Sequence, residues 1–339
     1  MPDISILESI NKIDKNQWNN LIKQSSTGSV FHCYEWLNVI ENGLQLQPKH
    51  ILVSENNNPL GVFPHFILNE QKVPFKKLCS LSPGFGGPVI GKGEETILPL
   101  MFKEIPHICK GNISLHSMIL NNMNYVKFGK FFVKSGYRMS LDGCRFYINL
   151  NEPYDEIIKH MDHHKRKELN KIKKTSYSVI EQKITIDLIS SFYKDYTNSL
   201  EKNNVNPYPL SFFEALFEEM NEHMKIFTAY VNDKTVGSIL CLLDGGKKII
   251  HGFFSAIPSD YFQYKPWIML HDFVLQWGKE HSYQIYDLGE TPADYLDSIF
   301  KYKQGFGGVI HPILLWEKSY SIIRWNIFKS GRYIYRRLS

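Results

Sequence analysis

The sequence predicts an α+β fold in which one order of elements occurs twice. Residues 50–63 consist of an apolar run, a polar turn and a second apolar run, and residues 227–240 repeat this pattern. β-Branched and aromatic residues on both sides of a polar turn are typical of β-hairpins. Gly61 and Gly237 hold the same place after the two turns. We therefore expect two similar units with mixed, mainly antiparallel sheets and flanking helices.

The elements around the first hairpin follow from apolar periodicity and turn residues. The glycine-rich loop at residues 82–88 lacks the Gly-Lys-Ser/Thr ending of a P-loop, so it predicts a tight turn with positive φ angles. Lining of a cleft is the alternative for this loop. The expected order is helices near residues 15–23 and 34–42, the hairpin, a strand near 77–82, the loop, a helix at 94–108 and a strand at 112–120.

The second hairpin has a similar order of neighbours. We expect one long helix over residues 155–174 before it, and a third helix that opens with a capping box formed by Ser211 and Glu214. Because the neighbouring elements repeat as well as the hairpin, duplication is favoured over a chance match. The full order is helices at 155–174, 187–200 and 211–221, the hairpin, a strand at 248–256, a helix at 266–280 and a strand at 284–288.

These patterns divide the chain into three parts, with the main boundary near residues 141–147. Residues 1–143 are predicted to form an N-terminal domain, residues 144–316 a C-terminal domain with the catalytic cleft, and residues 317–339 a basic, aromatic tail. Such a tail predicts peripheral contact with an anionic membrane surface, or equally a C-terminal helix docked on its domain.

The composition limits which class of protein this can be and which partners it suits. The chain has 339 residues, 43% of them hydrophobic, which is enough for two globular domains with real cores. A net charge of +5 permits contact with phosphates or anionic lipid without requiring it. The five cysteines include no Cys-x-x-Cys pair, which argues against a disulfide framework or a zinc site. We expect reduced thiols and no metal.

No targeting or membrane-spanning segment is expected. The first residues show no basic start followed by an apolar run, and no stretch approaches the ~20 apolar residues of a membrane span. We therefore expect a cytoplasmic protein, with peripheral contact at the inner face of the membrane as one of the two alternatives for its tail.

The stretch from Asp287 to Gly308 holds groups that chemistry would use. It begins where the strand at 284–288 runs into a loop, and it gathers carboxylates, aromatic rings, lysine and glycine. Loops held by a rigid scaffold are where reactive groups tend to lie. A solvated loop without a chemical role is the alternative.

Five motifs occur in order along the chain. They are Phe31-His-Cys-Tyr-Glu-Trp36, Gly84-Phe-Gly-Gly-Pro88, the basic helix around Arg166, Tyr286-Asp-Leu-Gly289 and Tyr302-Lys-Gln-Gly-Phe-Gly307. Through them the chain resembles the Fem-type aminoacyltransferases and their relatives, which are two fused GNAT-like domains. The resemblance implies transfer of an acyl or aminoacyl group from acyl-CoA or aminoacyl-tRNA to an amine of a cell-envelope glycan or peptide precursor. The donor would be a co-substrate, and no tightly bound cofactor is expected.

The resemblance also assigns roles within the second domain. Tyr302 and Lys303 match the family's Phe-Lys pair, so Lys303 is expected to stabilise the negative charge that forms on the carbonyl oxygen. A surface lysine is the alternative. Asp287 is expected to accept the proton of the attacking amine or to orient it, and a turn or cap role is its alternative. Tyr302, Phe306 and Glu290 are expected to contact substrate.

Basic and aromatic residues elsewhere complete the predicted site. Arg166 matches a phosphate-binding arginine of the family, and with Lys167 it is expected to contact acceptor phosphates; a solvated helix face is the alternative. Tyr264 and Lys265 stand where ordinary GNAT enzymes carry the glycines of the coenzyme A pyrophosphate loop, so they are expected to contact the donor. Trp36 is a further predicted substrate contact.

Two rival functions stay open at the level of sequence. One is N-acyl transfer from acyl-CoA to a nucleotide sugar or another small amine. The other is a non-catalytic RNA- or membrane-binding protein on a GNAT scaffold, because a fold alone does not establish an activity.

Overall fold

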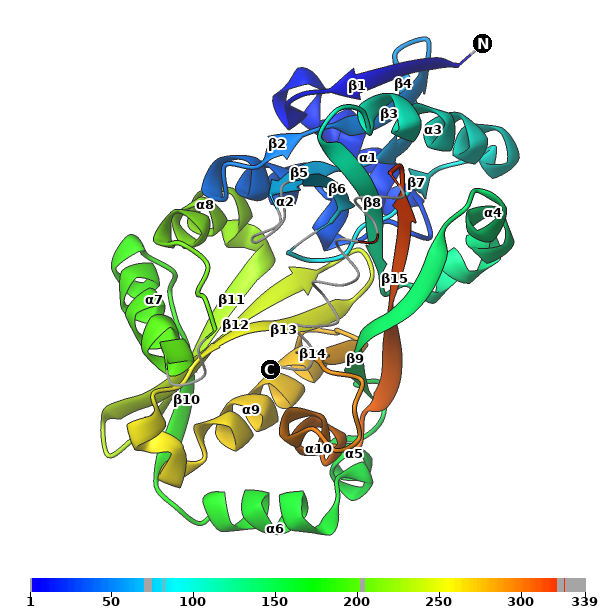
Figure 1. The fold of residues 1–339 in the computed structure, drawn as a ribbon. Helices are drawn as coiled ribbons and strands as arrows, with labels where there is room; N and C mark the ends of the chain where they lie inside the picture. Colours follow the sequence, from blue (N-terminus) through cyan, green and yellow to red (C-terminus); the bar gives the residue numbers. More distant parts are fainter. Residues whose placement is uncertain (1, 70–74, 82, 202–204, 322–325, 327–339) are drawn as a thin grey trace. The chain divides into compact units, whose positions relative to one another are not determined.

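The computed structural model describes residues 2–69, 75–81, 83–201, 205–321 and 326 (Figure 1). Contacts divide the chain into a first unit, Met1–Asp142 with Ile313–Ser339, and a second unit, Gly143–Pro312. Most of the predicted tail, residues 322–325 and 327–339, lies outside the described residues, so its membrane contact stays a prediction.

The first unit contains two groups of hydrogen-bonded strands. One is an antiparallel sheet in the order β1-β3-β4-β7. The other has the order β15-β8-β6-β5-β2, in which β6 and β8 are parallel. The strands are β1 (Asp3–Leu7), β2 (Gln47–Pro48), β3 (His50–Glu55), β4 (Asn58–Phe63), β5 (Phe66–Asn69), β6 (Lys76–Ser80), β7 (Val89–Ile90), β8 (Ile113–Leu120) and the end of β15 (Val309–Ser319).

Helices cover these strands and close an aromatic core. The helices are α1 (Lys15–Gln24), α2 (Tyr34–Asn38) with a π-helical continuation (Val39–Gly43), α3 (Glu94–Ile108) and α4 (Gly129–Lys134). Phe102 of α3 lies 5.5 Å from Phe63 of β4 and 5.4 Å from Phe132 of α4, measured between ring centroids. Aromatic rings therefore bridge the helices and the sheet.

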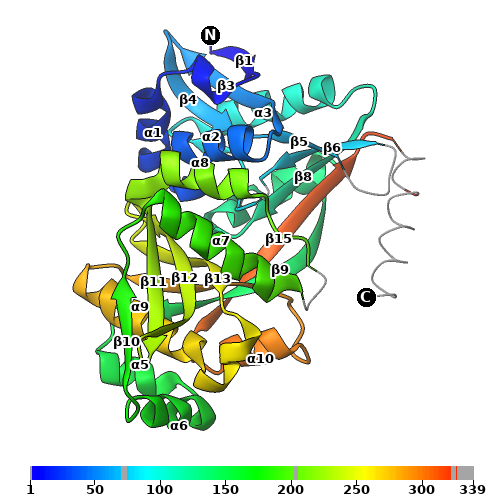
Figure 2. The same ribbon diagram turned by 90° about the vertical axis from the view of Figure 1, so that its left-hand side faces the viewer.

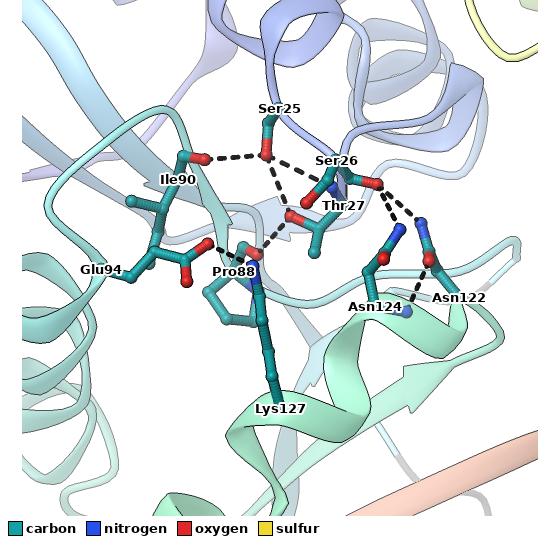
Figure 3. Close-up of polar contacts among 9 residues, drawn as sticks. All are labelled: Ser25, Ser26, Thr27, Pro88, Ile90, Glu94, Asn122, Asn124 and Lys127. Carbon is teal, nitrogen blue, oxygen red and sulfur yellow. Dashed lines mark hydrogen bonds and ion pairs between the residues drawn. The ribbon is translucent and has the colours of Figure 1, made fainter.

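Polar contacts after α1 hold the end of the glycine-rich loop (Figure 3). Ser25 Oγ donates to the Ile90 carbonyl at 2.8 Å, and Thr27 Oγ1 donates to the Pro88 carbonyl at 3.1 Å. Gly84 and Gly87 have φ angles of 92° and 114°, so the predicted turn with positive φ is confirmed.

The second unit is one mixed sheet with helices on it. Its strand order is β10-β11-β12-β13-β14-β9, in which β13 and β14 are parallel and the other pairs antiparallel. Helix α7 lies across β11–β13 (Figure 2). Its Tyr196 packs against Phe254 of β13, with ring centroids 5.3 Å apart. The strands are β9 (Arg138–Asn149), β10 (Tyr177–Glu181), β11 (Met224–Val231), β12 (Lys234–Asp244), β13 (Ile249–Ala256) and β14 (Ile285–Thr291). The helices are α5 (Tyr154–His160), α6 (His163–Ile172), α7 (Ile186–Glu201), α8 (Leu210–Met220), α9 (Pro266–Glu280) and α10 (Ser298–Gln304).

Two sequence-based expectations about helices differ from the structure. The helix expected over 155–174 is broken into α5 and α6, because Asp162 caps α6 through the Lys165 N–H. The capping box at Ser211 was wrong: α8 begins one residue earlier, with Pro209 at its N-cap, so Ser211 lies inside the first turn. The predicted boundary region 141–147 lies within strand β9, and the contacts divide the chain there, between Asp142 and Gly143.

The observed division of the chain differs from the predicted one at the end of β15. Residues 314–319 of β15 pair with β8, so they belong with the first unit, whereas residues up to 316 had been expected in the second domain. Within the described residues, no helix is both long and apolar enough to cross a bilayer.

The two hairpins pack in the same way. A Cβ at Gly61 would come within 2.5 Å of Met101 in α3. One at Gly237 would come within 2.8 Å of Ile257 Cγ1 and 3.2 Å of Cβ of Pro266, the first residue of α9. Each hairpin is therefore pressed against the helix that follows it, and a side chain at either glycine would force them apart. This shared packing accounts for the repeated glycine.

Candidate active site

The parallel strands β13 and β14 separate part-way along their length. Their register has three residue pairs, and the last joins His251 to Asp287. β13 continues to Ala256 and β14 to Thr291, without further pairing between them. Side chains from both strands therefore meet where the ladder ends.

Asp287 holds three elements together at this point. Its Oδ2 accepts hydrogen bonds from Arg145 Nε of β9 at 2.6 Å and from His251 Nδ1 of β13 at 2.7 Å. Its Oδ1 accepts from the Gly289 N–H at 2.9 Å. The side chains of Asp287, Arg145 and His251 are all buried. Because an ionised carboxylate only accepts, His251 donates from Nδ1.

The surroundings of Asp287 keep it ionised. Burial by itself raises the pKa of Asp287, but the charge of Arg145 and the hydrogen bonds from His251 and Gly289 outweigh it, and the net pKa is lowered. A carboxylate with a lowered pKa and both oxygens engaged is a weak proton acceptor. The contacts therefore favour the orienting role over proton acceptance for Asp287.

Lys303 lies on α10 next to this cluster. Helix α10 begins after Asp297, whose side chain accepts hydrogen bonds from the N–H groups of the first turn. Lys303 Nζ donates to the Glu290 carbonyl at 2.6 Å. It also lies beside Gly289, where a Cβ would come within 3.4 Å of Nζ. The strand end and the helix together fix where the ammonium group sits.

The charge state of Lys303 is set by its neighbours. Burial, followed by the charge of Arg145, lowers its pKa to about 8, while Asp287 and Glu290 oppose the shift. The ammonium form therefore predominates below pH ~8. A fixed, partly desolvated cation can stabilise negative charge that develops on a carbonyl oxygen.

An aromatic cluster lies next to Lys303. Lys165 Nζ of α6 lies 3.9 Å from the ring centroid of Tyr302 and 5.3 Å from that of Phe306. Phe306 packs against His271 with centroids 5.0 Å apart, and His271 Nδ1 and the Tyr286 hydroxyl are 2.6 Å apart. Burial lowers the pKa of Lys165 to about 8 and that of His271 to about 3. The cluster combines a second cation with a neutral imidazole.

The predicted phosphate- and donor-binding residues are partly engaged within the second unit. Arg166 Nη1 donates to the Lys159 carbonyl at 2.7 Å, at the end of α5, and Lys167 is exposed. Lys265 forms an ion pair with Glu168 and stands at the N-cap of α9 with a left-handed backbone, φ 55°. Arg166, Lys167 and Lys265 lie on or beside α6, and their substrate roles stay predictions.

The remaining predicted contacts are spread over the chain. Glu290 has an exposed side chain and offers its carbonyl to Lys303. Tyr264 is 38% exposed and precedes Lys265. Trp36 is fully buried in the first unit, edge-on to Phe31 at 5.3 Å. The burial of Trp36 favours a packing role, and its substrate contact stays a prediction.

Sequence reasoning missed three residues of this site. Arg145 and His251 stand on strands far from Asp287 in sequence, and Lys165 was one of several lysines in a basic run. Arg145 of β9 pairs with Glu290 of β14, and this strand register places the arginine beside Asp287. A charged residue within an otherwise apolar strand was the available signal for Arg145.

Comparison with known proteins defines the class. Residues 162–303 match the family described as acetyltransferase (GNAT) domain, a stretch that runs from the cap of α6 to Lys303. These residues form a GNAT-type acyltransferase domain. The resemblance of the chain to Fem-type tandem proteins is confirmed at the level of fold. The predicted α+β class with two GNAT-like units is confirmed as well. No curated protein matches the sequence.

Solved structures share this fold over nearly the whole chain. FemX is 10% identical, with a TM-score of 0.70 over 94% of this chain and 98% of its own. A tandem GNAT protein from the clavulanic acid biosynthesis pathway is 10% identical, with a TM-score of 0.59 over 95% and 99%. The C-terminal domain of a putative lysylphosphatidylglycerol synthetase from Agrobacterium fabrum is 11% identical, with a TM-score of 0.60 over 95% and 96%.

Proposed function

We propose that this protein transfers an aminoacyl group from aminoacyl-tRNA to an amine of a cell-envelope precursor. The observation that carries the proposal is Lys303, a partly desolvated cation held beside the Arg145–Asp287–His251 cluster where β13 and β14 part. The fold shared with FemX and with a putative lysylphosphatidylglycerol synthetase domain supports this substrate class.

The reaction needs little covalent chemistry from the protein. The acceptor nitrogen attacks the carbonyl carbon of the ester, the C–N bond forms and the C–O bond to the tRNA breaks. The nitrogen loses one proton and the departing oxygen gains one. The Lys303 ammonium stabilises the negative charge on the carbonyl oxygen between these events. Asp287 acts indirectly, because it fixes Arg145 and the Nδ1–H form of His251.

The start of α9 supports tRNA over coenzyme A as the donor. A pyrophosphate held at a helix N-terminus requires free backbone N–H groups. Here Pro266 occupies the first turn and has no N–H, and Lys265 is paired with Glu168. Arg166 and Lys167, at the exposed side of α6, are proposed to contact phosphates of the acceptor.

The choice of donor is tested with purified protein and mass spectrometry of the product. Charged tRNA and acetyl-CoA are each offered with a nucleotide-linked glycan-peptide precursor or with an amino-sugar nucleotide. We expect aminoacylated precursor from charged tRNA alone, and a weaker KM for the precursor after Arg166→Glu with Lys167→Glu. Acetylation of the amino-sugar nucleotide would instead establish the rival N-acyltransferase. Binding of RNA or membrane without any transfer would establish a non-catalytic scaffold.

A further inference from the structure

The first unit contains a cavity whose lining residues all lie outside the unit that holds Lys303. Its volume is about 300 Å³, at the lower end of the range for small-ligand sites. Parts of α3 and α4, the turn before β9 and the end of β15 form its wall. The lining residues are Pro99, Phe102, Lys103, Phe131, Ser135, Tyr137, Lys318 and Tyr320, all in the first unit.

One side of this cavity is aromatic. Phe102 meets Phe131 edge-on with centroids 5.1 Å apart, and it meets Tyr137 at 5.4 Å. Phe102 and Tyr137 are largely buried, so their rings are fixed by the core behind them. Fixed edge-to-face rings form a wall that suits an apolar or aromatic body.

The other side carries positive charge without a counter-ion. Lys318 Nζ lies 4.9 Å from the ring centroid of Tyr320 and 5.8 Å from that of Tyr137. Among the residues that the structure describes, no carboxylate forms an ion pair with Lys318 or Lys103. Two uncompensated lysines beside an apolar wall favour a ligand with one negative end.

A chain of hydrogen bonds leads from the cavity into the core. The Tyr137 hydroxyl bonds to Tyr320 and lies 2.5 Å from His116 Nδ1. His116 Nε2 lies 2.9 Å from His65 Nε2. Burial, with a smaller contribution from Lys318, lowers the pKa of His116 to about 3, so this imidazole is neutral and carries one N–H. The protons in this series of hydrogen bonds must therefore all point in the same direction along the series.

This directed chain gives the cavity a polar end. When His65 donates to His116 and His116 to Tyr137, the tyrosine hydroxyl protons point toward the cavity. The Tyr320 hydroxyl is then a donor, and the Lys318 ammonium lies 4.9 Å from the centroid of the same ring. A cation and a hydroxyl donor side by side match the two oxygens of a carboxylate.

We propose that this cavity binds a small amphipathic carboxylate, with its apolar body against Phe102 and Phe131 and its carboxylate at Lys318 and Tyr320. The cavity shares no lining residue with the proposed transfer site. The ligand class follows from the wall, the charge and the donors of this cavity alone.

Calorimetric titration of the full chain with 3-phenylpropanoate, and with the uncharged 3-phenylpropanamide, tests the proposal. We expect the carboxylate to bind at least about tenfold more tightly than the amide, the factor that ~1.4 kcal/mol corresponds to. Lys318→Met should remove this preference, Tyr320→Phe should reduce it, and Lys130→Met, an exposed lysine of α4, should leave it unchanged.

Several outcomes would overturn the proposal. These are no binding of the carboxylate at millimolar concentration, equal affinity for carboxylate and amide, or the same preference in Lys318→Met. If Lys318→Met does not fold, the affinities for carboxylate and amide are compared in Lys103→Met and Tyr320→Phe instead. An unchanged preference for the carboxylate in both variants would refute the proposal. Transfer activity in Lys318→Met should equal that of the unsubstituted protein, which separates failure here from failure of the proposed function.

Discussion

The two units differ in how much of their parallel strands is paired. In the first unit all five residues of β6 have partners on β8, from Lys76 to Ser80. In the second unit the ladder between β13 and β14 stops at His251 and Asp287. The units share a hairpin, a crossover helix and a glycine contact, but only the second opens its sheet. Under the proposed function, the duplicated fold supplies two scaffolds, and transfer takes place on the second.

The buried polar groups follow the same division. The first unit links His65, His116 and Tyr137, groups that stay neutral because burial disfavours their charged forms. The second unit pairs Arg145 with Asp287 as buried ions. Ions cost more to bury than neutral groups, so they are retained where their field acts on a substrate or a neighbouring cation.

Loss of the carboxylate at Asp287 should have the largest effect on stability. Asp287→Ala leaves Arg145 buried without its partner, and we expect the free energy of unfolding to fall by about 3–5 kcal/mol. Chemical denaturation measures it. The matched control is Asp297→Ala, an exposed helix cap of α10, for which about 1 kcal/mol is expected. Equal losses of unfolding free energy in the two variants would show that the buried ion pair stabilises the protein no more than the helix cap does.

Alanine at the two repeated glycines tests whether the units pack alike. Gly61→Ala and Gly237→Ala each force a methyl group against the following helix, so each should cost about 1–3 kcal/mol by overpacking. Thermal or denaturant unfolding gives the two values. Gly245→Ala, where a Cβ meets nothing within 4 Å, is the control. A loss of stability at only one of the two glycines would show that the two hairpins do not pack in the same way.

The neutral histidines of the first unit predict a pH dependence. The pKa of His116 is about 3 in the folded protein, against an ordinary 6.5. Below pH 6.5 the unfolded chain binds a proton that the folded chain does not, so stability falls as pH drops from 6.5 toward 3, by up to ~1.4 kcal/mol per pH unit. Unfolding titrations of His116→Gln should show a shallower fall over that range, and an unchanged slope would contradict the buried neutral state.

Local signals in the sequence were enough to predict several elements. Periodicity gave α3 and α9 with the bounds observed, 94–108 and 266–280, because each has a long apolar face and a marked start. The break at Asp162 could not be predicted, since its N–H bonds to the Gly305 carbonyl, far away in sequence. Tertiary contacts of this kind override local helix propensity.

The site shows the same limit. Asp287 and Lys303 were predicted from one loop, and the structure brings them together. Arg145 and His251 depend on strand register, which no local pattern in the chain specifies. Their effect is physical: Arg145 helps to lower the pKa of Lys303 and holds Asp287 ionised. The candidate lysine was therefore predictable from the sequence, while the groups that shift its pKa were not.

The central claim is that Lys303 stabilises charge in the transition state, and its most direct test is the transfer rate of Lys303→Met against that of Lys301→Met. Lys301 is exposed on the same short helix, two residues earlier, and serves as the matched control. We expect kcat to fall about 10²–10³-fold in Lys303→Met, the usual loss for one oxyanion donor, and to stay unchanged in Lys301→Met. Equal rates in the two variants would contradict the account.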